Sequence, residues 1–457
     1  MTDHSIQEIK KPEGIPTLEK PFLDKLRNTW FYRVYSRSLK QYPPVRWLFR
    51  WLWFNARPIY VNYVLPNIAS SSKRYALRWR SLEKLSDYFK QRQREINILA
   101  DEEIVKTPVP HIFPSCAQDY LRSPHDFYKS PKIWVANVID GMIYGGSNLV
   151  LVDDVVLCHD LYDFSRDYTS EELHSLTLIN SKHKRIRWLF HDANPDKIPA
   201  AATFVDACAS NYAHWLTEIL PRVAVFCAEE QFKDIPIVVN EGLHKNIVES
   251  LILVTGSERE IIYLPIGRAL QCDSLYVTSA TGYVPFGWRK KKLSDCSHGV
   301  FSPHAFTLMC KQITGQVKNI DNQSSPSKIF IRRNSDYRIV INSSEVENYF
   351  LSRGYVTVEP EKLTFLQQVA LFKNAKTIVS SSGAALANLI FAPPESKILI
   401  LISKHPDTIY WYWQNIACAS GKTIEYFLGK IKEKRFAGIH SSFFISLDDL
   451  ETLISKM

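Results

Sequence analysis

The sequence lacks any long apolar run and any closely spaced pair of cysteines. No stretch reaches the ~20 consecutive apolar residues that a membrane-spanning helix needs. The 8 cysteines are scattered without a Cys-x-x-Cys pair, which argues against a zinc ribbon and a thioredoxin-like motif. Residues 1–18 are polar and charged, without the apolar segment of a secretory signal. We therefore expect free thiols in a reducing compartment, and a protein that is cytoplasmic or held on the inner face of the plasma membrane.

Acidic residues are in the minority. The chain has 47 Asp and Glu against 56 Lys and Arg, a formal net charge of +9, which favours anionic partners. Phosphate-bearing substrates, anionic lipid and nucleic acid all fit this charge, and charge alone does not choose among them. With 46% hydrophobic and 23% charged residues over 457 positions, the chain is expected to fold as two α/β domains with a tail.

Residues 22–80 are unusually rich in Trp, Tyr, Phe, Arg and Lys, as in the run from Arg46 to Phe54. Interleaved aromatic and basic side chains suit a lipid headgroup layer, so an anionic membrane surface is one expected partner. A helical layer packed on the domains, or on the second subunit of a homodimer, is the other interpretation. No RNA-binding motif accompanies the segment, so a nucleic-acid partner is not expected.

Alternating strand and helix patterns predict an α/β fold. Short apolar runs around Gly145 and Gly146 predict strands joined by tight turns over residues 132–161. Strands alternating with helices farther along indicate a parallel sheet. The predicted strands are 235–239, 261–264, 274–278, 328–332, 355–358, 377–380 and 397–402, and the predicted helices are 244–254, 303–317, 344–353, 364–373 and 384–391.

The domain boundary is expected between the loop 282–299 and the polar stretch 318–327, which flank a helical segment. This places an aromatic and basic helical extension at 1–100 and an N-terminal Rossmann-like domain at 101–300. A C-terminal Rossmann-like domain follows at 301–425. A tail helix that packs back is predicted at 426–457.

The first motif surrounds His214. On a helix, His214, Glu218 and Arg222 are spaced four residues apart and lie close to one face. A carboxylate one turn from an imidazole can fix its tautomer and raise its basicity, as a general base for a hydroxyl requires. A ladder of salt bridges between two helices would use the same spacing. Asn211 precedes the group, and we place Asn211 and Arg222 on the acceptor side of a site.

The second motif follows the predicted strand 328–332. Arginines that leave the carboxyl end of a strand stand at the crevice where open α/β sheets bind ligands. Their planar guanidinium groups suit a diphosphate. A solvated basic loop is the other interpretation. The candidate donor-binding residues are Arg332, Arg333, Asn334 and Arg338.

The third motif is a turn of small residues between a strand and a helix. Backbone N–H groups and the helix dipole at such a turn favour an anion. The signal is weak, because neither Gly-x-Gly-x-x-Gly nor a P-loop lysine is present, and a turn chosen only for tight packing is the alternative. The candidate donor-binding residues here are Ser382, Gly383, Ala384 and Asn388.

Further polar residues follow predicted strands. Asp160, with His159 and Asp206, is a candidate for the acceptor side of a cleft. The sequence has no Asp-x-Asp triplet, and the pair Asp153 and Asp154 follows a strand-like run, where an edge turn is expected rather than a Mg²⁺ site. We therefore expect neither a bound metal nor another cofactor.

Taken together, the three motifs resemble the family 61 glycosyltransferases, a group that includes plant, animal and bacterial enzymes of glycan synthesis. The family's Asn-x-x-His-x-x-x-Asp/Glu element is matched by Asn211, His214 and Glu218, with Pro221 and Arg222 completing its bacterial form. Its arginine-rich strand end is matched from Arg332 to Arg338. Its Gly-Pro-His-Gly-Ala element and the Phe-x-Pro-Pro that follows are matched by Gly383, Ala384, Asn388, Phe391, Pro393 and Pro394.

One departure stands out in this resemblance. Ser382 occupies the position where the family commonly has histidine, so the donor contact of that histidine does not carry over. The resemblance implies a GT-B fold, with two facing Rossmann-like domains, and an inverting mechanism. The donor nucleotide would bind mainly to the C-terminal domain.

The sequence thus predicts a metal-independent glycosyltransferase. It would move a sugar from a nucleotide-sugar donor to a glycan or lipid-linked glycan acceptor, in capsule or lipopolysaccharide synthesis. His214 or Glu218 would be the base. An inactive glycan-binding or scaffold protein of the same fold is the alternative. A dinucleotide-dependent epimerase is disfavoured, because no glycine fingerprint follows an early strand.

Overall fold

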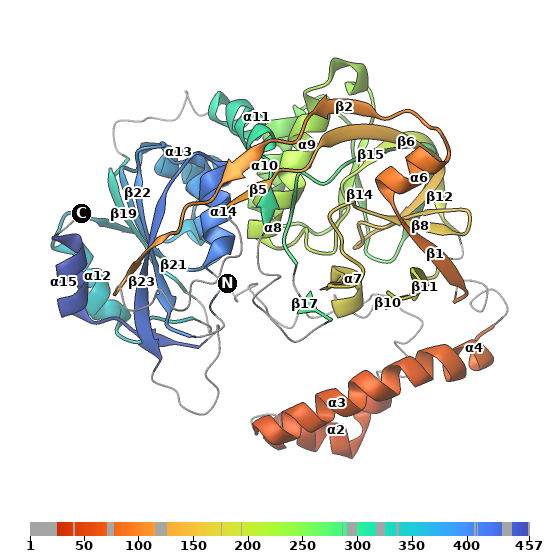
Figure 1. Ribbon diagram of the computed structural model, residues 1–457, viewed down its shortest axis with the longest axis horizontal. Helices are drawn as coiled ribbons and strands as arrows, with labels where there is room; N and C mark the ends of the chain where they lie inside the picture. Colours follow the sequence, from red (N-terminus) through yellow and green to blue (C-terminus); the bar gives the residue numbers. More distant parts are fainter. Residues whose placement is uncertain are drawn as a thin grey trace.

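The computed structural model describes residues 25–39, 42–70, 77–114, 126–174, 176–192, 194–285, 287–289, 299–316, 325–334, 338–405, 408, 410–431 and 441–455. Two large β-sheets form its body, each in its own lobe, and a separate layer of helices lies outside them (Figure 1). The fold is mixed α/β, as the sequence predicts. Residues 1–24, Cys116 and Cys296 lie outside the described residues, and the other six cysteines are free thiols.

The N-terminal sheet is mixed rather than parallel throughout. Its parallel pairings are β15–β12–β13–β14 and β1–β8, and β6, β7 and β8 form an antiparallel meander, as expected for strands joined by tight turns. Its strands are β1 (Trp79–Lys84), β2 (Asn97–Ala100), β6 (Ile133–Tyr144), β7 (Val150–Val152), β8 (Val155–Cys158), β10 (Thr177–Asn180), β11 (Arg185–Trp188), β12 (Asp196–Thr203), β13 (Ile237–Asn240), β14 (Ile261–Leu264) and β15 (Ala269–Thr278).

The C-terminal sheet is parallel except for β24, which pairs antiparallel with β23. A short strand from far upstream, β4, pairs with β23 in this sheet, although the sequence analysis placed its residues in the N-terminal domain. The segment predicted as a tail helix contains such a helix, α15, which packs back on the C-terminal sheet, but it begins with the end of β23 and with β24. The strands are β4 (His111–Phe113), β19 (Lys328–Ile331), β20 (Val356–Val358), β21 (Thr377–Ser381), β22 (Lys397–Ser403), β23 (Ile424–Ile431) and β24 (Phe443–Phe444).

Helices between the sheets bury one continuous apolar core. Trp215, Phe306, Phe365 and Trp413 are all buried in it, although they come from both halves of the chain. Each such side chain contributes about 1.5–3 kcal/mol by leaving water. The helices of this layer are α9 (Leu220–Cys227), α10 (Lys245–Thr255), α11 (Pro303–Thr314), α13 (Phe365–Asn374), the 3₁₀ helix η10 (Ala384–Phe391) and α14 (Trp411–Ala419). Two further helices, α12 (Ser343–Leu351) and α15 (Leu447–Ile454), cover the other face of the C-terminal sheet.

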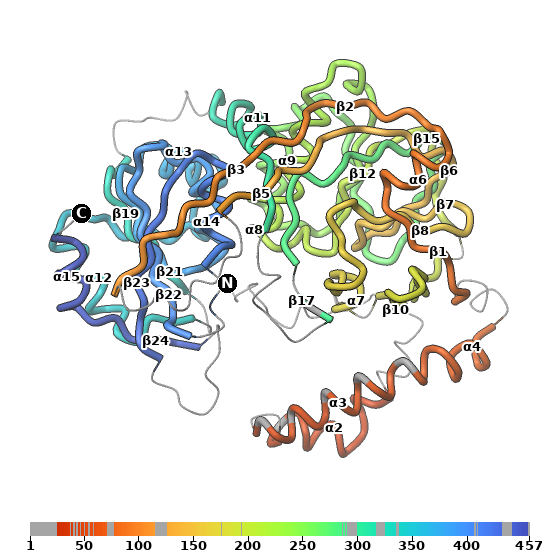
Figure 2. Tube along the Cα trace, in the orientation of Figure 1, coloured from red at the N-terminus to blue at the C-terminus, as the bar shows by residue number. Residues whose placement is uncertain are grey.

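Shorter elements complete the body. Figure 2 shows β3 leading from the N-terminal lobe towards the C-terminal one, and β5, antiparallel to β3, leading back. These elements are β3 (Ile104–Lys106), α6 (Leu85–Gln91), β5 (Phe127–Lys129), β9 (Asp167–Tyr168), α7 (Ser170–Leu173), the 3₁₀ helix η5 (Glu230–Phe232), β16 (Gly282–Tyr283), β17 (Gly287–Trp288), β18 (Val300–Phe301) and the 3₁₀ helix η9 (Pro360–Lys362).

The aromatic extension forms helices that lie outside both lobes and touch the N-terminal sheet near β11 (Figure 1). They are α2 (Trp30–Val34), α3 (Pro43–Ile59) and α4 (Leu65–Ile68), joined by the π-helical turns η1 (Tyr35–Leu39) and η2 (Tyr60–Val64). Val61 and Leu65 pack on Leu189, and Nη1 of Arg187 donates to the Val61 carbonyl over 2.6 Å. Among the described residues, none of the helices is both long and apolar enough to span a bilayer.

Candidate active site

The helix that carries the His214 motif contains a π-helical turn. It starts as α8 (Tyr212–His214), passes through η4 (Trp215–Ile219) and continues as α9. The N–H of Leu220 bonds to the carbonyl of Trp215, and Pro221, the next residue, has no N–H to donate. The Thr217 carbonyl lies against Gly282, where a Cβ atom would stand 2.7 Å from the carbonyl oxygen. The sequence of this helix therefore favours the wider turn on which Glu218 lies, and such turns are frequent at functional sites.

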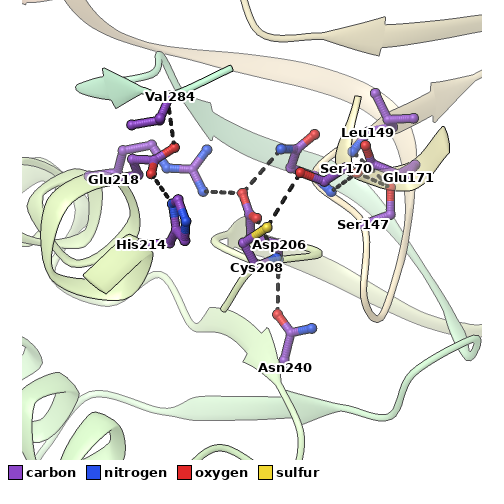
Figure 3. Close-up of polar contacts among 12 residues, drawn as sticks. Ser147, Leu149, Ser170, Glu171, Asp206, Cys208, His214, Glu218, Asn240 and Val284 are labelled. Atoms are coloured by element: carbon purple, nitrogen blue, oxygen red, sulfur yellow. Dashed lines mark hydrogen bonds and ion pairs between the residues drawn. The ribbon is translucent and has the colours of Figure 1, made fainter. Parts of the chain in front are cut away.

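Glu218 and His214 are in direct contact, as their spacing predicts. Oε1 of Glu218 meets Nδ1 of His214, and Oε2 accepts a hydrogen bond from the backbone N–H of Val284 over 3.3 Å (Figure 3). The side chains are 15% and 9% exposed, respectively. The carboxylate is therefore held by two contacts in a nearly dry environment, where electrostatic interactions are strong.

A polar cavity opens beside Glu218. It is lined by Glu218 and Arg222 from the helix and by His159, Glu171, Asp206 and Tyr283 from the N-terminal sheet side. His214 is not among the lining residues, so the carboxylate rather than the imidazole faces the cavity. Burial and the nearby charge of Arg222 lower the pKa of His159 to about 3, so the ring is neutral. Burial raises the pKa of Glu171 to about 7, with the negative charge of Asp206 adding to the rise.

Arg222 lies on the cavity wall. Its Nη2 is 3.9 Å from Oδ2 of Asp206, too long for a hydrogen bond. Burial lowers the pKa of Arg222, against the opposing effect of the Asp206 and Glu218 carboxylates. Asp206 is held on the other side by Asn148 Nδ2 at 3.1 Å and by the Cys208 N–H at 2.8 Å.

Two other acceptor-side candidates, Asn211 and Asp160, cap helices. The Asn211 side chain accepts a hydrogen bond from the Ala213 N–H over 3.0 Å and caps α8. The Asp160 carboxylate accepts from the Ser86 N–H over 2.9 Å, in the first turn of α6. Neither side chain lines the cavity. His159, the neighbour of Asp160, does line it.

On the C-terminal side, Arg333 and Arg338 converge on the small-residue turn. The Arg333 guanidinium lies against Gly383, where any Cβ atom would collide with Nη1. Nη1 of Arg338 donates to Ser382 Oγ over 3.3 Å, and Nε1 of Trp413 donates to the same oxygen over 3.0 Å. The second and third motifs therefore meet at the carboxyl ends of β19 and β21, as the sequence predicts.

Arg332 and Asn334 point elsewhere, into an acidic cluster. Arg332 pairs with Glu347 on α12 and lies 3.6 Å from Glu359. Asn334 Nδ2 donates to Glu359 over 2.8 Å and to Glu361 over 2.6 Å. The structure thus does not bring Arg332 and Asn334 to Gly383. Their N–H groups donate to nearby carboxylates, which the sequence alone does not place beside them.

Asn388 and Ala384 also have packing roles. Asn388 is fully buried, and its Nδ2 donates to Gln368 Oε1 over 2.9 Å. Ala384 begins η10 and packs against the shared core. The element after Gly383 is a 3₁₀ helix rather than the predicted α-helix. An anion at this place would therefore be bound by the backbone N–H groups of the turn, without the dipole of a following α-helix.

Tyr412 lies within electrostatic reach of both sides of the site, which the sequence alone does not predict. Burial raises its pKa, the negative charge of Glu218 raises it further, and a hydrogen bond with Thr217 and the positive charge of Arg338 oppose the rise. Tyr412 is therefore close enough to Glu218 and Arg338 to feel both charges. From the sequence, the Trp-Tyr-Trp run of α14 is expected to pack in the aromatic core, with stacking on a sugar or base as the alternative. Within the described residues, no three His, Cys, Asp or Glu side chains are grouped as metal ligands.

Comparison with known families gives the class of protein. Residues 212–399 match a glycosyltransferase family model, and the chain is a glycosyltransferase of class EC 2.4. The matching model is Glycosyltransferase 61, in agreement with the motif resemblance. The match begins one residue after Asn211 and includes His214, Glu218, Arg333 and Ser382. No curated protein shows a significant match to the chain.

Proposed function

We propose that the chain transfers a sugar from a nucleotide-sugar donor, with inversion and without a metal, to a hydroxyl of a glycan or lipid-linked glycan. The observation that supports this most is the place of Glu218. Its carboxylate lines the polar cavity, and the charges of both Glu218 and Arg338 act on Tyr412. The proposed base and the proposed cationic donor site therefore both lie within electrostatic reach of one side chain.

Glu218 is the proposed base and His214 its positioning partner. The acceptor oxygen would attack the anomeric carbon while the bond from that carbon to the diphosphate oxygen breaks, and the hydroxyl proton would pass to Glu218. The contact with His214 and the Val284 N–H would hold the carboxylate in its reactive orientation. This assignment favours Glu218 over His214 because only Glu218 lines the cavity.

Arg333 and Arg338 are the proposed partners of the leaving diphosphate. Both lie at the turn Ser382–Gly383, and a guanidinium group can stabilise the charge that develops on the leaving oxygens. Two arginines can meet this need without a divalent cation. Ser382, where the family commonly has histidine, would leave donor recognition here to the arginines and the backbone.

A GT-B arrangement is part of the proposal. The cavity residue Asp206 follows the carboxyl end of β12, and Gly282 follows that of β15. Arg333 follows the carboxyl end of β19, and Ser382 follows that of β21. Open α/β sheets bind ligands beyond the carboxyl ends of their strands, so both sheets would offer their binding edges to one cleft.

The donor can be identified by thermal unfolding. The full chain would be screened against UDP-, GDP-, CMP- and dTDP-linked sugars, with and without EDTA. We expect one nucleotide class to raise the midpoint, equally in both conditions. A shift that EDTA abolishes would contradict metal independence. Stabilisation by none of the four classes would favour the inactive, glycan-binding alternative.

The extension 25–70 is the proposed contact with an anionic membrane surface. Between Lys25 and Leu82 the sequence contains no Asp or Glu and many Lys and Arg. Large apolar side chains along α3 are exposed, with Trp47 at 63% and Trp51 at 51%. Aromatic rings and basic groups both gain free energy at a lipid headgroup layer. A peripheral enzyme there would meet lipid-linked acceptors of capsule or lipopolysaccharide synthesis.

A further inference from the structure

The cavity beside Glu218 contains buried polar atoms without hydrogen-bond partners. No hydrogen-bond acceptor in the described part of the chain reaches Nε or Nη2 of Arg222, and Nδ1 of His159 is likewise unsatisfied. Leaving such groups buried and unpaired costs free energy. A polar guest that accepts hydrogen bonds would therefore be stabilised in this cavity.

The opposite wall offers acceptors. Asp206 Oδ2 lies 3.9 Å from Arg222 Nη2, so the two groups do not bond directly. An oxygen placed beside both could accept from Arg222 and donate to Asp206 at ordinary hydrogen-bond lengths. A hydroxyl group is the oxygen that can do both, because it carries one donor and two acceptor lone pairs.

The charges of the cavity disfavour an anionic guest. The carboxylates of Asp206 and Glu218 line it, with the carboxyl group of Glu171, whose raised pKa favours the neutral form, and the cation Arg222. A carboxylate or phosphate could accept from Arg222 but would lie beside Asp206 and Glu218, and like charges in a partly dry site repel strongly. An uncharged hydroxyl pairs with both kinds of group.

We propose that Arg222 and Asp206 form a clamp for a second hydroxyl of an uncharged acceptor sugar, beside the hydroxyl that loses its proton to Glu218. The clamp rests on the proposed function, and it narrows the acceptor to neutral sugars with at least two hydroxyls within reach of one another. Sugars that present a carboxylate at this position are excluded.

Two features of the structure support this clamp. Asp206 is pre-positioned: its N–H donates to Asn240 Oδ1 over 2.9 Å, and its side chain accepts from Asn148 and Cys208 (Figure 3). The cavity measures about 40 Å³, enough for about three water-sized groups. One hydroxyl or hydroxymethyl group fits this space, and the rest of the ring would lie at its mouth.

The test measures the binding of small glycosides to the full chain by saturation-transfer NMR. The probes are methyl glucoside, galactoside and mannoside, each paired with its methyl uronide, in which a carboxylate replaces the hydroxymethyl group. We expect saturation transfer to at least one neutral glycoside and affinity at least tenfold weaker for its uronide. Equal or tighter binding of the uronides, or no transfer to any neutral glycoside, would overturn the clamp.

Variants test the residues themselves. Asp206→Asn and Arg222→Lys should each weaken binding of the neutral glycoside about tenfold or more, as expected for loss of a charge-assisted hydrogen bond. Arg268→Gln is the matched control, because Arg268 also pairs with carboxylates, those of Asp192 and Asp196, but lies outside the cavity. If folded Asp206→Asn binds the neutral glycoside as tightly as the wild type, the proposal is contradicted. This conclusion holds even if Arg222→Lys does not fold.

Donor binding keeps this test separate from that of the proposed function. If a nucleotide-sugar stabilises the wild-type chain while the uronides bind as well as the neutral glycosides, only the clamp fails. If no nucleotide-sugar binds, the transferase mechanism fails, and the glycoside comparison still decides what the cavity accepts.

Discussion

The phenol oxygen of Tyr212 lies 2.9 Å from Oδ1 of Asn388. This contact joins the helix of His214 and Glu218 to the helix that follows Ser382 and Gly383. Asn388 also donates to Gln368, so three side chains form a buried polar network inside the shared core. The network sets how the proposed base stands relative to the proposed donor site.

Removing the amide should destabilise the whole chain. In Asn388→Ala, the buried Tyr212 hydroxyl loses its partner at 2.9 Å and Gln368 loses a donor, so we expect a loss of about 1–3 kcal/mol. Urea unfolding followed by tryptophan fluorescence measures it. Asn180→Ala, at an exposed position, is the control. A loss no larger than that of the control would contradict the network's role.

The arginines should separate into two groups. Arg333→Ala and Arg338→Ala are each expected to weaken binding of the nucleotide-sugar by about 1.5–3 kcal/mol, because each would remove a hydrogen bond to a charged group. Arg332→Ala should leave that affinity within a few-fold, since Arg332 is paired with Glu347. Isothermal titration calorimetry gives all three values. The opposite ranking would return Arg332 to the donor site.

The division between Arg332 and Arg333 shows what a single sequence can predict here. The strand end and its cluster of arginines were predictable, because the apolar periods of the strand 328–332 and of the helix 344–353 show where each element ends. Which guanidinium faces the ligand depends on Glu347 and Glu359, residues 15 and 27 positions away that only the folded chain brings close. Asn388 is a similar case, since its burial depends on Tyr212 from the other half.

Much of the C-terminal fold was predictable for the same reason. The strand and helix predictions between residues 328 and 402 agree with the structure to within about two residues, because each helix and strand there has its own apolar period. The position of β4 was not predictable. A strand of three residues carries no periodic signal. Its partner, β23, lies more than three hundred positions farther along the chain, so only the packing of the folded chain decides the pairing.

Glu171 should make stability depend on pH. Its folded-state pKa is raised to about 7 from 4.5, so the folded state retains a proton that the unfolded state loses. Stability is then fullest below pH 4.5 and falls as pH rises towards 7, by at most about 1.4 kcal/mol per pH unit. Glu171→Gln keeps the acceptor oxygen but removes this titration.

The midpoint of thermal unfolding tests that expectation. The difference between Glu171→Gln and the wild type should grow in favour of the variant between pH 5 and pH 7.5. His159 titrates in the opposite sense, since its lowered pKa makes stability fall as pH drops below 6.5, but it is common to both proteins and cancels in the difference. A difference independent of pH would contradict the raised pKa.

Membrane binding should depend on the exposed tryptophans of α3. We expect Trp47→Ser combined with Trp51→Ser to reduce binding to vesicles with anionic lipid about a hundredfold or more, because each ring that enters the lipid layer contributes about 1.5–3 kcal/mol. Co-sedimentation measures it, with neutral vesicles as the reference. The control is Tyr263→Ser, a partly exposed aromatic on β14. Equal binding by the double variant and the control would remove α3 from the contact.

The place of Glu218 as the base is tested most directly by Glu218→Gln in the full chain. With the donor found by thermal unfolding, one measures turnover by release of nucleoside diphosphate and donor affinity by calorimetry, with exposed Glu230→Gln as the control. We predict a fall in kcat of about 10²–10⁴ with donor affinity unchanged. Turnover within a few-fold of the wild type would contradict the assignment and place the base elsewhere.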